Sequence, residues 1–107
     1  MLELTTAVDG TAHTVALTGE LDHRTAPRLH AALDGLRLAA GDRLVLDLTG
    51  LTFCDSSGLS AFIAAHELSS GAVELVAPPA MVVRMLHVTG LTEIFTVHDA
   101  DRGRLTR

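Results

Sequence analysis

Apolar residues recur along the chain with two spacings, one typical of strands and the other typical of helices. Alternation predicts strands at residues 2–8 and 12–18. The Asp9-Gly10 turn between them indicates an antiparallel hairpin, because both residues tolerate positive φ angles. Short apolar runs bounded by turn residues predict the remaining strands, which lie at residues 43–48, 73–76 and 94–97.

Helical spacing, with apolar residues three and four positions apart, follows three of these strands. We expect the first helix at residues 26–40, with Pro27 in its first turn and Gly41 at its end. We expect another helix between Pro78-Pro79 and Gly90. Because helical crossovers join parallel strands, the prediction is an α/β fold with a mixed, mostly parallel sheet of 4–5 strands, 3–4 packed helices and an N-terminal β-hairpin.

The chain is organised around a central stretch that predicts a buried strand, a loop at residues 49–54 and a helix from about Ser57 to Leu68. Asp55, Ser56 and Ser57 at the start of this helix are all good N-cap residues, although capping needs only one of them and contributes about 1 kcal/mol. Three in a row before a glycine indicate a further role. A phosphate on an exposed serine would be tolerated here, because helix N–H groups and the helix dipole favour negative charge.

Composition and charge narrow the choice of function. Apolar residues make up 48% of the 107 residues, so we expect one globular domain over residues 1–107, with 100–107 as a loose tail. The net charge of −5, without a basic stripe, argues against nucleic acid as a partner. The chain shows no apolar run of membrane-spanning length, no signal peptide and a single cysteine, so we expect a cytoplasmic protein without direct membrane insertion.

The motifs of common enzyme and cofactor sites are missing, so we expect no catalytic residue, no cofactor and no metal. The sequence has no glycine-rich phosphate loop and no Gly-x-Ser-x-Gly motif. Ser56 needs a base to act as a nucleophile; Asp22 or Asp55 could lie near it, but no histidine is placed to complete a triad. Cys54 is expected to be a small apolar residue. None of the histidines shows metal-ligand spacing; they are His13, His23, His30, His66, His87 and His98.

Separated motifs along the chain are similar to those of one protein family. Residues 19–26, Gly-Glu-Leu-Asp-His-Arg-Thr-Ala, resemble its second motif, and residues 55–59, Asp-Ser-Ser-Gly-Leu, match its phosphorylation motif. Residues 78–86 and 89–91 resemble its third helix and the turn after it. Over about residues 4–97 the chain resembles STAS domains, in particular bacterial anti-sigma factor antagonists of the sporulation type.

The resemblance implies a binding module that phosphorylation switches off. In this family the anti-sigma factor is a serine kinase that phosphorylates the first serine of the motif, a role that carries over to Ser56. The unphosphorylated form binds the anti-sigma factor and frees the sigma factor, which regulates transcription, and a serine phosphatase restores that form. The matching aspartate contacts the partner, so Asp22 takes this role beside the alternative of capping alone. Ser57 is expected to be the structural cap and Gly58 the position of close approach. The expected partner-binding residues are Asp22, Thr25, Asp55, Ser57, Gly58 and Leu59.

Two other classes of function stay open. STAS modules that do not switch are binding subunits of phospholipid-transport ATPase complexes or stressosome-type scaffolds, and the neighbouring genes would discriminate these. A serine-dependent enzyme would show ester turnover that Ser56→Ala abolishes. The segment between residues 59 and 73 is about one turn shorter than is usual in the family, with only Gly71 in place of paired glycines, which leaves the identity of the partner open.

Overall fold

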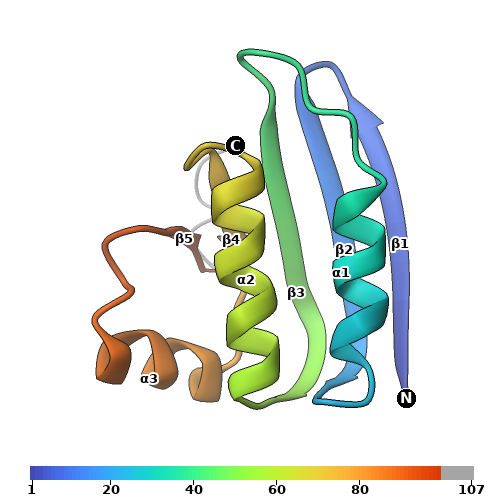
Figure 1. Ribbon diagram of the computed structural model, residues 1–107. Helices are drawn as coiled ribbons and strands as arrows, with labels where there is room; N and C mark the ends of the chain where they lie inside the picture. Colours follow the sequence, from blue (N-terminus) through green and yellow to red (C-terminus); the bar gives the residue numbers. More distant parts are fainter. Residues whose placement is uncertain (100–107) are drawn as a thin grey trace.

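The structure is a computed structural model that describes residues 1–99. Its five strands form one sheet in the order β1-β2-β3-β4-β5. β1 runs antiparallel to β2 and all other neighbours are parallel, so the sheet is mixed (Figure 1). Together with the three helices, this arrangement confirms the predicted fold class. The elements are β1 (Leu2–Asp9), β2 (Ala12–Leu21), α1 (Ala26–Asp34), β3 (Arg43–Cys54), α2 (Ser56–Leu68), β4 (Val73–Val76), α3 (Ala80–Thr89) and β5 (Thr96–His98).

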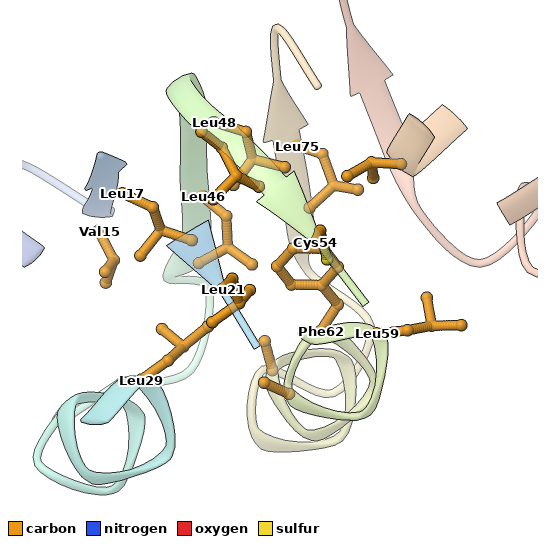
Figure 2. Packing of buried hydrophobic residues seen from close by; sticks show 14 of the residues in the cluster. Val15, Leu17, Leu21, Leu29, Leu46, Leu48, Cys54, Leu59, Phe62 and Leu75 are labelled. Atoms are coloured by element: carbon orange, nitrogen blue, oxygen red, sulfur yellow. The ribbon is translucent and has the colours of Figure 1, made fainter. Parts of the chain in front are cut away.

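The core lies between the sheet and the two helices α1 and α2, which run side by side over one face of the sheet (Figure 1). Along β3, Leu44, Leu46 and Leu48 are fully buried, because alternate residues of a strand point to the same face. Leu29 of α1 and Phe62 of α2 are also fully buried and point toward the strands (Figure 2). Burying one such side chain stabilises the fold by about 1.5–3 kcal/mol, so packing holds these helices in place.

β3 is longer than predicted, and the loop expected at residues 49–54 is wrong. This segment is the second half of the strand and stays paired with β2 as far as Cys54. Two register shifts near Thr18 keep the strands paired, as β-bulges do. A Cβ at Gly50 would lie 2.7 Å from the Thr18 hydroxyl oxygen, so the close pairing at the first shift favours glycine. As a result, β2 and β3 end together at Leu21 and Cys54.

α1 is shorter than predicted, and the helix expected at residues 26–40 ends at Asp34. Gly35 takes the C-cap position, and its N–H donates to the carbonyl oxygen of Ala31 at 3.2 Å. Leu36 and Leu38 still pack against the core from the connection that follows. The apolar pattern therefore continued past the helix end because it served core packing and not a further helical turn.

The other elements lie close to their expected places. Gly10 has a φ of +62° at the hairpin, and Gly90 ends α3 with a φ of 75°. β4 occupies its predicted residues. The last strand, expected at residues 94–97, begins two residues later as β5, because Phe95 is buried at a bend just before it.

α3 is held beside the end of β3, where the backbone N–H of Cys54 contacts the Met81 sulfur at 3.3 Å. Figure 1 shows α3 next to the first turns of α2, away from α1. The tail predicted at residues 100–107 lies outside the described residues. Within residues 1–99, every helix is too short or too polar to cross a membrane.

Candidate functional site

Both carboxylates of the predicted site lie at the edge of the sheet where β2 and β3 end. Leu21 pairs with Cys54, and the backbone N–H of Asp55 donates to the carbonyl oxygen of Leu21 at 3.2 Å. Asp22 and Asp55 directly follow these strands, so their loops leave the sheet at the same end, the lower end in Figure 1. In open α/β sheets, this carboxyl edge is where ligands and partners are usually bound.

Asp55 is the N-cap of α2. One of its carboxylate oxygens accepts hydrogen bonds from the N–H groups of Ser57, at 2.8 Å, and Gly58, at 3.4 Å. The prediction that Ser57 caps the helix is therefore wrong. A carboxylate one position earlier satisfies these N–H groups and also interacts favourably with the positive helix end.

Ser56 is the first residue of α2, and its side chain is exposed. Its hydroxyl makes no hydrogen bond within residues 1–99, because Asp55 takes the capping role. A protein that approaches this edge can therefore reach the Ser56 oxygen without any unfolding of the helix. This is the geometry that a phosphorylation site needs.

Gly58 is enclosed by the protein's own side chains. A Cβ at this position would lie 2.5 Å from the Cys54 sulfur and 2.8 Å from the nearest Leu21 methyl carbon. The small size of Gly58 therefore lets α2 pack tightly onto the ends of β2 and β3. This differs from the expectation of an open backbone for an approaching molecule, and a partner contact at Gly58 stays a prediction.

The loop between β2 and α1 is held by Asp22 and Thr25. One oxygen of the Asp22 carboxylate accepts from the N–H groups of Arg24, at 2.9 Å, and Thr25, at 3.1 Å. The Thr25 hydroxyl donates to the carbonyl oxygen of Glu20 at 2.8 Å. Thr25 occupies the N-cap position of α1, yet its side chain makes no capping bond, so it orders the loop instead.

The charge of Asp22 is stabilised by the same loop. Partial burial raises the pKa of its carboxyl, but the hydrogen bonds from the Arg24 and Thr25 N–H groups and the Thr25 hydroxyl outweigh this, and the pKa is lowered. The second carboxylate oxygen has no hydrogen-bond partner within residues 1–99. Asp22 therefore presents an ionised, partly exposed oxygen that can accept a bond from a basic group of another protein.

A groove of about 260 Å³ opens beside Ser56, between α2 and α3. Leu59 is the apolar residue of its α2 wall; it is only 8% exposed, belongs to the buried cluster, and points to the other side of α2 from Phe62 (Figure 2). Val88 on α3 is 80% exposed, which is unusual for a large apolar side chain. Sequence reasoning assigned no site residue to this helix, so it missed the groove; the available signal was an apolar residue, Val88, on the same helix face as Arg84. The lining residues are Ser56, Leu59, Arg84, Met85, Val88 and Thr89.

The other nucleophile at this edge is Cys54, which is buried next to Asp55. Burial, together with the neighbouring Asp55 charge, raises the pKa of its thiol to about 12. The thiol is therefore neutral at physiological pH and packs as a small apolar group. Among residues 1–99, no three histidine, cysteine or acidic side chains group closely enough to hold a metal ion.

Comparisons with known proteins show the family of this chain. The family model described as Mlab, STAS domain, matches residues 4–97. An anti-sigma F factor antagonist from Paenibacillus polymyxa is 35% identical over 86% of this chain and 82% of its own length. An anti-sigma-B factor antagonist from Listeria monocytogenes is 31% identical over 81% of this chain and 79% of its own length.

A solved structure supports the same assignment. The crystal structure of an anti-sigma factor antagonist from Mycobacterium paratuberculosis has a TM-score of 0.81 and 27% identity, and the match covers 99% of this chain and 92% of that one. The family model covers nearly all of the described residues, and sequence relatives and fold point the same way. The chain belongs to the STAS domain family.

Proposed function

We propose that this chain is a cytoplasmic anti-sigma factor antagonist, which binds a serine-kinase anti-sigma factor until Ser56 is phosphorylated. The observation that carries the proposal is the exposed Ser56 hydroxyl at the start of α2, on the same sheet edge as Asp22 and Asp55. The names of the two sequence relatives support an antagonist function.

Phosphorylation would change the charge of this edge without rebuilding it. The Ser56 oxygen attacks the γ-phosphorus of ATP bound to the kinase, the bond to the ADP oxygen breaks, and the serine proton passes to a base of the kinase. The product carries a charge of about −1.5 to −2 near two carboxylates. Because Ser56 is exposed and its hydroxyl holds no structural bond, the fold tolerates this group. Repulsion and bulk then weaken docking, and a serine phosphatase reverses the change.

The proposed docking surface combines three kinds of contact. Asp22 offers a charged oxygen for a basic residue of the partner, and Thr25 keeps the Asp22 loop in position. Val88 offers exposed apolar surface in the groove beside Ser56, and Leu59 lies at its base. Asp55 accepts hydrogen bonds from the N–H groups of Ser57 and Gly58 and so holds the first turn of α2, on which Ser56 is exposed. Contacts of these three residues with the partner stay predictions.

A non-switching STAS binding subunit, of a phospholipid-transport ATPase complex or a stressosome-type scaffold, is the second candidate. The observation that favours it is the description of the matching family model, which names Mlab and not an antagonist. The two candidates differ in one measurable property, which is whether Ser56 gains and loses a phosphate.

The test is a kinase reaction read by mass spectrometry. The chain is incubated with ATP and a serine-kinase anti-sigma factor from the same organism, and phosphorylated peptides are mapped. We expect a single phosphate on Ser56, none in Ser56→Ala, and unchanged labelling in Ser57→Ala, a matched control one residue away. Labelling at another residue, or no labelling with tight binding that ATP leaves unchanged, would contradict the switch and favour the second candidate.

A further inference from the structure

The groove between α2 and α3 places an arginine on the wall that faces Ser56. Ser56 and Leu59 are three residues apart on α2 and so share one helix face, and both line the groove. Arg84 and Val88 are four residues apart on α3 and line the opposite wall. Ser56 and Arg84 therefore border the same groove of about 260 Å³ from opposite walls, through the carbon atoms of their side chains.

The guanidinium of Arg84 forms no ion pair within residues 1–99. Its side chain is exposed and takes no part in the ion pairs or hydrogen bonds of the described chain. By contrast, Arg28 donates to the carbonyl oxygen of Leu2, and Arg43 pairs with Glu74 at 3.5 Å. Arg84 can therefore move to a new anion without breaking a contact that the fold uses.

We infer that Arg84 binds the phosphate of phosphorylated Ser56 within the same chain, and that this pair closes the groove over Leu59 and Val88. The inference rests on the proposed phosphorylation of Ser56. A guanidinium presents paired N–H donors that match two phosphate oxygens, so the contact is bidentate and stronger than a neutral hydrogen bond. The long aliphatic stem of Arg84 then lies across the apolar side chains below it.

The consequence is that phosphorylation removes an apolar docking surface as well as adding negative charge. An unmodified Ser56 leaves Val88, which is 80% exposed, open to an apolar side chain of the partner, with the buried Leu59 at the base of the groove. A phosphate held by Arg84 covers them from above. Two changes at one position make the release of the partner more complete than repulsion alone.

The inference is tested on a chain that carries phosphoserine at position 56 from its synthesis, so that no kinase is needed. A ³¹P NMR titration follows the second pKa of the phosphate, which is about 6 in an unperturbed phosphoserine. A cation in contact with the phosphate favours the dianion, so we expect the pKa in the wild-type chain to be lower by about 1 unit. In Arg84→Gln the value should return to that of a phosphoserine peptide.

The matched control is Arg37→Gln, which removes an exposed arginine that lies outside the groove and should leave the titration as in the wild type. Glutamine keeps much of the aliphatic stem, and thermal unfolding of the unphosphorylated variants confirms that the fold is intact. Equal pKa values in the wild type and Arg84→Gln would overturn the inference. Failure of a kinase to label Ser56 would instead count against the proposed function and would leave this titration unaffected.

Closure of the groove has its own readout in the methyl NMR signals of Leu59 and Val88. We expect both signals to shift when the phosphate is present in the wild type, and the Val88 shift to be lost in Arg84→Gln. Val88 lies on the opposite helix from Ser56, so its response reports the bridge across the groove. If the Val88 signal of the wild type is the same with and without the phosphate, the inference that the groove closes is wrong.

Discussion

The two ends of the β2–β3 pair each carry an aspartate with a lowered pKa, but the two carboxylates serve opposite purposes. At the amino end, Asp42 accepts hydrogen bonds from the N–H of Ala39 and from the His13 ring, both at 2.9 Å. The side chains of His13 and Asp42 are only 10% and 14% exposed. At the carboxyl end, Asp22 is bound through one oxygen and leaves the other open.

The comparison shows what separates a structural carboxylate from one that is available to a partner. At the amino end, one oxygen of Asp42 accepts hydrogen bonds from the loop before β3 and from His13 on β2. The carboxylate and the imidazole ring are therefore both occupied by a contact within the chain. At the carboxyl end, backbone N–H groups stabilise Asp22, and it forms no ion pair within residues 1–99. A charge that is held in place but not paired is the kind that another protein can recognise.

The largest effect on stability is expected from Gly58→Ala at the carboxyl end. The new Cβ would lie 2.5 Å from the Cys54 sulfur, and α2 would have to shift or strain. Overpacking of this kind costs about 1–3 kcal/mol, which urea unfolding measures. Adding Cys54→Ala should recover part of the loss, since it removes the closest atom.

Gly35→Ala is the matched control for this change. A Cβ at Gly35 would have no neighbour closer than 3.6 Å, and its φ of −82° suits alanine. We expect a change of less than about 0.5 kcal/mol, as for other surface substitutions. Equal losses for the two glycines would show that α2 does not depend on close packing at Gly58.

The next effect is on binding and comes from Asp22→Asn. Asparagine keeps an oxygen for the N–H groups of Arg24 and Thr25, so the loop should persist while the charge disappears. We expect the affinity for the anti-sigma factor to fall about tenfold, as measured by calorimetry. Asp42→Asn at the other end should leave the affinity unchanged; if it weakens binding as much, the contrast between the ends fails.

A smaller effect is expected from Asp55→Ala, which removes the cap of α2. Loss of an N-cap costs about 1 kcal/mol, to be measured by thermal or urea unfolding. Ser57→Ala should be nearly neutral because its hydroxyl does not cap the helix. A larger loss for Ser57→Ala than for Asp55→Ala would reverse the assignment of the cap.

The smallest effect is expected on the stability at acid pH and comes from Asp42→Asn at the amino end. The N–H of Ala39 and the His13 ring lower the pKa of Asp42 below its usual 3.8, so its contribution to stability is present above that value. This contribution is lost as the pH falls through the lower pKa of the folded state. Unfolding curves between about pH 6 and pH 2 should therefore fall less steeply for Asp42→Asn than for the wild type. Asp34→Asn, at an exposed position, should follow the wild type.

Local signals in the sequence were enough to predict the elements that depend on near neighbours. Gly10 and Gly90 adopt the positive φ angles that their turns require, so the hairpin and the end of α3 were predictable. The exposed start of α2 was predictable too, because N-cap residues precede a regular apolar spacing. The resemblance of the motifs then pointed to Ser56 and Asp22 before any contact was known.

Pairing and packing between distant residues decided the rest. β3 continues to Cys54 only because β2 pairs with it through two register shifts. The sequence of residues 49–54 by itself does not predict this pairing. Gly58 is required by Leu21, and the groove beside Ser56 exists because α3 is held next to α2. The sequence by itself determined the elements, the turns and the identity of the candidate phosphoacceptor, since these rest on local backbone preference and a linear motif. The tertiary structure alone decided strand length, the role of Gly58 and the closeness of Arg84 to Ser56, because each depends on residues far apart in the chain.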